Sequence, residues 1–177
     1  MILELNGIYA NLRFSSAHIV FGHDSCGAIH GHSYYVDLKV CGEPTGEFGF
    51  VCDFKLLKNA VKEICNELDH KLLVPLNHPN LKYNINDNNN NNNNNKNNKT
   101  VNFTYINNNK IKEYKLPLED VVLLNLKSTT AEDLSIYFAE KIKNKLEKSN
   151  NIGNINYIEV TVNEGIGQGA RYILKTK

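Results

Sequence analysis

An asparagine-rich tract interrupts the chain near its middle and limits what the sequence can fold into. Between Asn84 and Asn109, 16 of 26 residues are asparagine, including an unbroken run at Asn88–Asn95. Such a tract buries no apolar surface, and asparagine competes with regular backbone hydrogen bonding, so nothing offsets the entropy lost on ordering it. The composition therefore predicts a disordered insertion at about 84–110. A folded domain can tolerate it, because loop-closure entropy grows slowly with length.

The residues before this tract predict two strands followed by a helix. Apolar residues alternate with polar or smaller ones over 8–14 and again over 32–40, which is the period of half-buried strands. Asp53 stands where a helix N-cap belongs, ahead of apolar residues at helical spacing from Phe54 to Leu68. We expect this helix to end near Asp69.

The residues after the tract reverse this order. The segment Thr129–Glu132 predicts a capping box, in which a Thr hydroxyl and a Glu carboxylate satisfy free amides at the start of a helix. Apolar residues from Leu134 to Leu146 then follow on one helix face. Alternation returns over Tyr157–Glu164, and a turn at Gly165–Gly169 leads to a last strand at Arg171–Leu174.

Strands joined by short turns favour an α+β fold with an antiparallel sheet. The element order predicts a four-stranded sheet with two helices packed on one face. A chain of 177 residues, 41% of them hydrophobic, has the size of one domain, here 1–177.

Charge and hydropathy exclude several classes of partner. The 20 basic and 19 acidic residues leave a net charge of +1, which excludes a strongly basic nucleic-acid-binding protein. The sequence has no apolar stretch of membrane-spanning length, and its N-terminus lacks the apolar core of a signal peptide. We therefore expect no nucleic-acid or membrane partner, and a cytoplasmic location.

Three histidines are candidate ligands of one metal ion. His30 and His32 are two residues apart, so on a strand they share a face, and His18 has the parity of the apolar residues before it. A hairpin could bring His18 alongside the pair. Three imidazoles without a fourth protein ligand match the open tetrahedral site of catalytic zinc. A His-Gly-His sequence is also common as an incidental feature of a strand, so both interpretations stand on spacing alone.

Cys26 differs from the other three cysteines. Cys41, Cys52 and Cys65 lie in apolar runs and are expected to be buried free thiols, whereas Cys26 lies in a glycine-containing loop before His30. A thiol close to a cation forms the thiolate more readily, and the thiolate is the useful base or nucleophile. As a fourth zinc ligand, Cys26 would instead close the site. The residues alone leave both roles open.

Two further positions carry carboxylates of interest. Asp69 precedes His70 at the end of the first helix, where the pair is either a charged helix terminus or a tautomer-fixed proton shuttle. Glu164 continues the parity of the apolar residues in its strand, and among nearby residues only Arg171 offers a cation. A buried carboxylate needs hydrogen-bond donors, such as the amino-pyrimidinone edge of a pterin or guanine. Escape into solvent at the following turn is the alternative.

These segments together resemble the 6-pyruvoyl-tetrahydropterin synthase / 6-carboxy-tetrahydropterin synthase family. Six ordered motifs carry the resemblance: FSSAH (14–18), CGAIHGHSYYVDLKV (26–40), GFVCDFKLLK (49–58), LDHKLL (68–73), STTAEDLSIYF (128–138) and VTVNEG (160–165). The resemblance implies the tunnelling fold, with elements in the order ββααββ, and a homo-oligomer, usually a hexamer. It spans nearly the whole chain apart from the insertion.

The resemblance also implies the roles of the candidate site residues. It implies Zn²⁺ as the cofactor, and the zinc ligands would be His18, His30 and His32. It implies that the catalytic residues are Cys26, as a thiol rather than a ligand, with Asp69 and His70 contributed by a neighbouring subunit. The residues binding the pterin would be Glu164, Thr129 and Thr130.

The spacing of the motifs indicates a branch of this family. The four-residue step from Cys26 to His30 resembles the 6-carboxy-tetrahydropterin synthases, which supply deazapurine tRNA bases. The implied activity is a zinc-dependent lyase converting 7,8-dihydroneopterin triphosphate to 6-carboxy-5,6,7,8-tetrahydropterin, with release of acetaldehyde and triphosphate. The alternatives are 6-pyruvoyl-tetrahydropterin synthesis and a non-catalytic zinc- and pterin-binding protein. A further branch carries a glutamate directly before the His-Gly-His, where this chain has Ile29.

Overall fold

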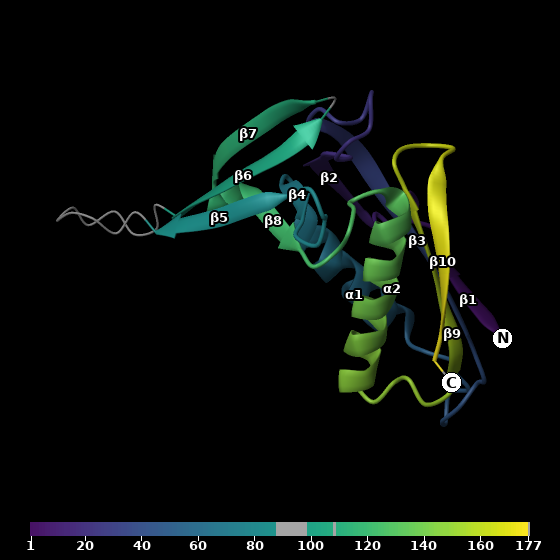
Figure 1. Cartoon of the computed structure of the whole chain (residues 1–177). Coiled ribbons are helices and arrows are strands. Elements are labelled where there is room, and N and C mark those ends of the chain that lie inside the picture. Colours follow the sequence, from purple (N-terminus) through teal and green to yellow (C-terminus); the bar gives the residue numbers. More distant parts are fainter. Residues whose placement is uncertain (88–98, 108, 177) are drawn as a thin grey trace. The chain divides into compact units, whose positions relative to one another are not determined.

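The computed structural model describes residues 1–87, 99–107 and 109–176 (Figure 1). In chain order the elements are β1 (Ile2–Leu5), β2 (Arg13–His18), β3 (His30–Gly42), α1 (Phe54–Leu68), β4 (Leu72–Pro75), β5 (Lys82–Asp87), β6 (Lys99–Asn107), β7 (Lys110–Pro117), the 3₁₀ turn η1 (Leu118–Asp120), β8 (Val121–Leu124), α2 (Ala131–Lys148), β9 (Ile155–Asn163) and β10 (Gly169–Lys175). Among the described residues, no helix is both long enough and apolar enough to cross a membrane.

The larger sheet is mixed rather than antiparallel. Its seven strands have the order β10-β9-β3-β2-β4-β8, with β1 pairing with β3 off this path. Strands β1, β3, β9 and β10 pair antiparallel, whereas β4 pairs parallel with both β2 and β8. The two predicted helices are present, but the predicted four-stranded antiparallel sheet and the simple order ββααββ are wrong.

Strands β4 and β8 were not predicted because their sequences lack the alternation of apolar and polar residues that identifies a half-buried strand. All four residues of Leu72–Pro75 are buried, so this segment shows no alternation of apolar and polar side chains. Strands with parallel neighbours on both sides are typically continuous apolar runs, and a run of four cannot be assigned from periodicity. Strand β8 is likewise a short apolar run, VVLL, although only its first and last residues are buried.

The chain comprises two compact units, each described here by itself. The first unit contains Met1–Ser15, His32–Asp69 and Thr130–Lys177, and the second contains Ser16–Gly31 and His70–Thr129. The single domain expected over residues 1–177 stays a prediction.

In the first unit the apolar face predicted for β3 is buried. The alternating residues of this strand from Tyr34 to Val40 are at most 1% exposed. Helix α2 packs against β9, β10 and α1, and Figure 1 shows the two helices beside each other. The side chains of Leu134, Phe138, Ile142 and Leu146 are all buried, which confirms the predicted face of α2.

The helix starts differ in how well their caps were predicted. The Asp53 carboxylate accepts a hydrogen bond of 2.6 Å from the Lys55 amide, which confirms the N-cap of α1, and the helix ends at Leu68 as expected. Helix α2 instead has Thr130 as its N-cap, with no capping hydrogen bond from that side chain. The capping box starting at Thr129 is therefore wrong by one position.

The predicted first strand also begins too early. Residues 7–11 form a turn in which the Leu12 amide donates to the Gly7 carbonyl oxygen at 2.8 Å, and Asn11 has a φ of 55°. Asparagine tolerates this left-handed conformation better than most residues. The strand therefore starts at Arg13, although the alternation of apolar residues runs on from Ile8.

In the second unit the described part of the asparagine-rich tract is ordered as strands. Strands β5, β6 and β7 form a three-stranded antiparallel sheet. The side chains of Val101, Phe103 and Tyr105 alternate along β6 and are at most 1% exposed, in a cluster that includes Ile19 and Phe21. These three large side chains offset the entropy of ordering, so the expected loop does not extend over β5 and β6. The run Asn88–Asn95 lies outside the described residues.

Replacing residues 88–98 by an Asn-Gly pair should leave the fold intact. Asp87 and Lys99 are register partners in β5 and β6, so a two-residue turn can join them. The shorter loop lowers the free-energy cost of loop closure by about 1.5 kcal/mol, which should raise the unfolding temperature slightly. Thermal unfolding measures the change in unfolding temperature. The control replaces residues 88–98 by a Gly/Ser segment of the same length as the native one. A drop of many degrees in the shortened variant alone would contradict the prediction.

Candidate metal centre and active site

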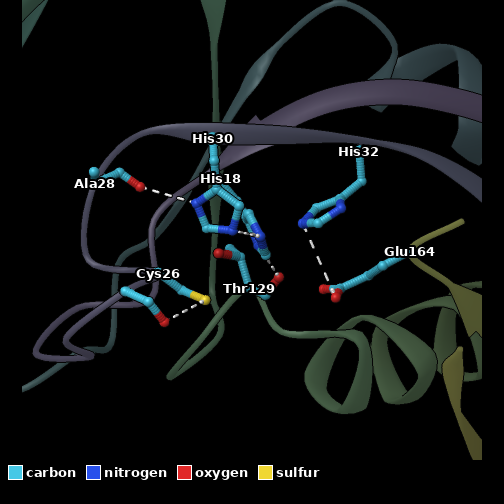
Figure 2. Close-up of polar contacts among 8 residues, drawn as sticks. His18, Cys26, Ala28, His30, His32, Thr129 and Glu164 are labelled. Atoms are coloured by element: carbon cyan, nitrogen blue, oxygen red, sulfur yellow. Dashed lines mark hydrogen bonds and ion pairs between the residues drawn. The ribbon is translucent and has the colours of Figure 1, made fainter.

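Three imidazoles converge at the ends of two strands. His18 is the last residue of β2, and His30 and His32 lie at the start of β3. Their ligand nitrogens all lie within 4.8 Å of one another. His18 is only 1% exposed, while the other two are half-buried, so part of the group is accessible to solvent. Figure 2 shows these three side chains together with their nearest polar contacts.

Backbone carbonyl groups fix the orientation of two of the rings. The Nδ1 atom of His18 lies 2.7 Å from the Thr129 carbonyl oxygen, and the Nδ1 atom of His30 lies 2.9 Å from the Ala28 carbonyl oxygen. A carbonyl oxygen only accepts, so each Nδ1 carries the proton and donates it. In the neutral rings, both Nε2 atoms then carry lone pairs. Such contacts to the far ring nitrogen are typical of histidines that bind metals.

The two Nε2 atoms face each other at 3.0 Å. Two lone pairs at this separation repel, and a cation between them removes the repulsion. Tetrahedral ligands of zinc, at about 2.1 Å from the ion, lie about 3.4 Å apart, so a small movement of these rings accommodates it. The donor set of three imidazole nitrogens suits zinc among the common biological cations.

Cys26 lies in a tight loop beside this group. Its amide donates to the His23 Nδ1 atom at 3.0 Å, and its carbonyl oxygen accepts from the Val20 amide at 3.0 Å. The sulfur lies 3.6 Å from the Ser25 hydroxyl and is half-buried. Figure 2 shows the thiol pointing toward the imidazoles of His18 and His30. Within the described residues, the group of mutually close ligand atoms consists of the three imidazoles and does not include this sulfur.

Glu164 follows directly after β9 and lies against His32. Its Oε2 atom is 4.0 Å from the His32 Nε2 atom, and both side chains are about one-fifth exposed, at 22% and 21%. Burial, and then the negative charge of Glu164, raise the pKa of the Tyr34 phenol well above its usual range. The charge of Glu164 is therefore felt at the buried end of Tyr34. Arg171, the cation that the sequence places nearby, instead pairs with Glu159 at 3.4 Å.

Thr129 contacts the histidine group through its backbone carbonyl oxygen. Its carbonyl oxygen orients His18, and its buried hydroxyl has no hydrogen-bond partner in the described part of the chain. Thr130 is half-buried as the N-cap of α2. The structure thus places one of the two predicted threonines next to a metal-ligand candidate.

Asp69 and His70 lie at the end of α1. The Asp69 carboxylate accepts a hydrogen bond of 2.7 Å from the Ser15 amide. His70 is exposed and has a φ of 58°, so the chain reverses there into β4. Their assignment as catalytic residues stays a prediction.

All four cysteines are free thiols. Cys52 and Cys65 are buried, as predicted. Cys41 is half-buried, so that expectation is wrong, because it lies on the face of β3 opposite to the residues from Tyr34 to Val40.

Sequence reasoning did not single out four features of this site, which are His23, two backbone carbonyl groups and Tyr34. His23 accepts the Cys26 amide, and the carbonyl groups of Ala28 and Thr129 fix the imidazoles. Backbone carbonyl groups leave no signal in the residue pattern. Tyr34 could have been found, since it continues the parity of His32 on β3.

Comparison with known proteins places the chain in a family. A family model described as "6-pyruvoyl tetrahydropterin synthase" matches residues 7–174. The chain belongs to this family. A curated relative from Methanocaldococcus jannaschii, named "Putative 6-carboxy-5,6,7,8-tetrahydropterin synthase", is 59% identical over 97% of this chain and 96% of its own length. An Aquifex aeolicus relative, named "6-carboxy-5,6,7,8-tetrahydropterin synthase", is 26% identical over 84% of this chain and 76% of its own length. Family membership and these names indicate a lyase.

A solved structure of the same family has a similar fold. The 6-pyruvoyl tetrahydropterin synthase of Plasmodium falciparum matches with a TM-score of 0.82 and 27% identity, over 99% of this chain and 98% of that one. The predicted fold of the 6-pyruvoyl tetrahydropterin synthase family is therefore confirmed in its coarse form, with two helices and the corrections to the sheets given above.

Proposed function

We propose that this chain is a zinc-dependent 6-carboxy-5,6,7,8-tetrahydropterin synthase. Its substrate would be 7,8-dihydroneopterin triphosphate, and acetaldehyde and triphosphate would leave. The observation that carries the proposal is the approach of the His18 and His30 Nε2 atoms to 3.0 Å, while both Nδ1 atoms face backbone carbonyl oxygens. The 59% identical relative named for this activity and the four-residue step from Cys26 to His30 support the choice of branch.

The chain would bind zinc through His18, His30 and His32. Zinc held there supplies Lewis-acid polarisation of the oxygens on the substrate side chain. The bonds from His18 to Thr129 and from His30 to Ala28 keep the rings in the ligand tautomer without further reorganisation.

Glu164 would anchor the pterin ring, with Thr129 and Thr130 beside it. A carboxylate accepts two parallel hydrogen bonds from the amino group and ring N–H of an aminopyrimidinone, as it does from a guanidinium. The location of Glu164 next to His32 would orient the ring so that its side chain points to the histidines.

Cys26 would act on a proton of the substrate side chain. Its loop lies beside His30, and its half-buried sulfur is accessible to a bound molecule. Asp69 and His70 would form the opposing acid–base pair, contributed across a subunit interface of a homo-oligomer, such as a hexamer. Water would supply the second oxygen of the carboxylate. The electrons lost as the side chain is cleaved would reduce the C6=N5 bond of the dihydropterin ring and the carbon that releases triphosphate, which becomes the methyl group of acetaldehyde. The redox change would therefore be internal to the substrate, with no nicotinamide or flavin needed. The product would be a precursor of deazapurine tRNA bases.

Incubating the purified protein with zinc and 7,8-dihydroneopterin triphosphate tests this proposal. We expect 6-carboxy-5,6,7,8-tetrahydropterin, acetaldehyde and triphosphate in equal amounts, identified by mass and by trapping the aldehyde. Release of triphosphate without acetaldehyde would instead support the 6-pyruvoyl reaction, which the similarity to the Plasmodium falciparum structure makes the second candidate. Tight pterin binding with no triphosphate release would contradict both and support a non-catalytic binding protein.

A further inference from the structure

The carbonyl group that follows Cys26 is held by two donors from the sheet β5-β6-β7. The Tyr105 hydroxyl, from β6, donates to the Gly27 carbonyl oxygen at 2.6 Å, and the Lys112 ammonium, from β7, donates to the same oxygen at 3.0 Å. The Tyr105–Gly27 bond is buried. A carbonyl oxygen can accept both bonds at once, and the bond from the charged ammonium is the stronger type.

Apolar packing seats the same loop on β6. The ring centroids of Phe21 and Tyr105 are 4.4 Å apart, and Phe21 and Ile19 belong to one buried cluster with Phe103. The Val20 amide closes the loop by donating to the Cys26 carbonyl oxygen. The loop from Ile19 to Gly27 therefore rests on β6 through both apolar and polar contacts.

The Tyr105 phenol stays protonated and so remains a donor. Burial raises its pKa above the usual range, and interaction with Tyr114 raises the pKa further. The rings of Tyr105 and Tyr114 are nearly parallel with centroids 6.2 Å apart, so this contact helps to hold the plane of the Tyr105 ring.

We propose that Tyr105 and Lys112 are positioning residues that hold the Cys26 loop through the Gly27 carbonyl. The inference rests on the proposed function, because it assigns these residues to the placement of the catalytic thiol. It gives β6 and β7, which directly follow the asparagine-rich run, a part in the reaction. Neither side chain contacts the reacting atoms in this proposal.

The first test compares Tyr105→Phe with Tyr83→Phe. Both changes remove one hydroxyl from the same sheet, but Tyr83, on β5, is 45% exposed. We expect kcat to fall about 10-fold in Tyr105→Phe through loss of one hydrogen bond, and about 100-fold when Lys112→Met is added. The KM and the zinc content should stay unchanged, and Tyr83→Phe should behave as wild type.

The second readout is the alkylation rate of Cys26 by iodoacetamide at fixed pH, followed by mass spectrometry of its peptide. A looser loop should raise this rate several-fold in Tyr105→Phe. Cys65 serves as the internal reference, because it is buried and burial raises the pKa of its thiol to about 12. A merely destabilised protein would alkylate Cys65 faster as well.

Each outcome decides between the proposals. An unchanged Cys26 alkylation rate in both the single and the double variant would overturn the positioning role. A raised rate at Cys26 alone supports that role even if the wild-type protein fails to turn over the pterin, in which case the proposed function alone fails. A fall in kcat with equal gains at Cys26 and Cys65 would mean general loosening, and would also overturn the proposal.

Discussion

Cys26→Ala should reduce kcat by about 10³-fold or more while leaving one zinc ion per subunit. The thiolate would act as the base or proton relay in the proposed reaction, and such groups contribute factors of about 10²–10⁴. Zinc should remain because the sulfur is not in the group of close ligand atoms formed by His18, His30 and His32. Single-turnover kinetics and metal analysis of the same preparation measure both quantities.

Cys41→Ala is the matched control for that variant. Cys41 is also half-buried and free, but lies at the far end of β3, so its removal should leave kcat near the wild-type value. Loss of zinc from Cys26→Ala would make the thiol a fourth ligand and would remove the open coordination position from the proposal.

His32→Ala should abolish both zinc binding and turnover. The variant leaves only His18 and His30 of the three imidazoles that lie within 4.8 Å, and two ligands are too few for a catalytic zinc site. We expect the zinc content to fall below about one-tenth of an ion per subunit, and kcat to fall below about 10⁻³ of the wild-type value, since the Lewis acid is lost. Metal analysis after dialysis against a weak chelator provides the measurement.

His78→Gln is the control for the metal measurement. His78 is half-buried in the second unit and is not in the group of close ligand atoms, so its variant should keep its zinc. Full activity of His32→Ala without metal would refute the Lewis-acid role and, with it, the assignment of zinc as the cofactor.

The elements that the sequence predicted well are those in which the periodic apolar pattern extends over many residues. Helix α1 extends from its Asp53 cap to Leu68, and α2 buries the expected stripe from Leu134 to Leu146, because both patterns persist over several turns. The strand predicted over Tyr157–Glu164 is present as β9, although it covers Ile155–Asn163 and ends before Glu164. The parity of His30 and His32 likewise placed the candidate ligands on one face of β3.

The features that the sequence could not reveal depend on contacts between distant segments. Strand β4 is a continuous apolar run of four residues, and only its parallel neighbours define it. Strand β6 is ordered because three of its side chains are buried, although the asparagine-rich composition around them predicted disorder. The bond from Tyr105 to Gly27 joins residues 78 positions apart, with an acceptor in the backbone.

The pairing of Asp87 with Lys99 makes residues 88–98 a natural position for attaching a reporter. Asp87 and Lys99, the residues on either side of the segment, are paired with each other in one hairpin. The free energy of loop closure grows only with the logarithm of loop length, so an inserted peptide tag should change the stability of the fold little. A fluorophore or affinity tag placed there would lie at the opposite end of β6 from Tyr105. Purification and single-molecule studies could then use it without altering either terminus.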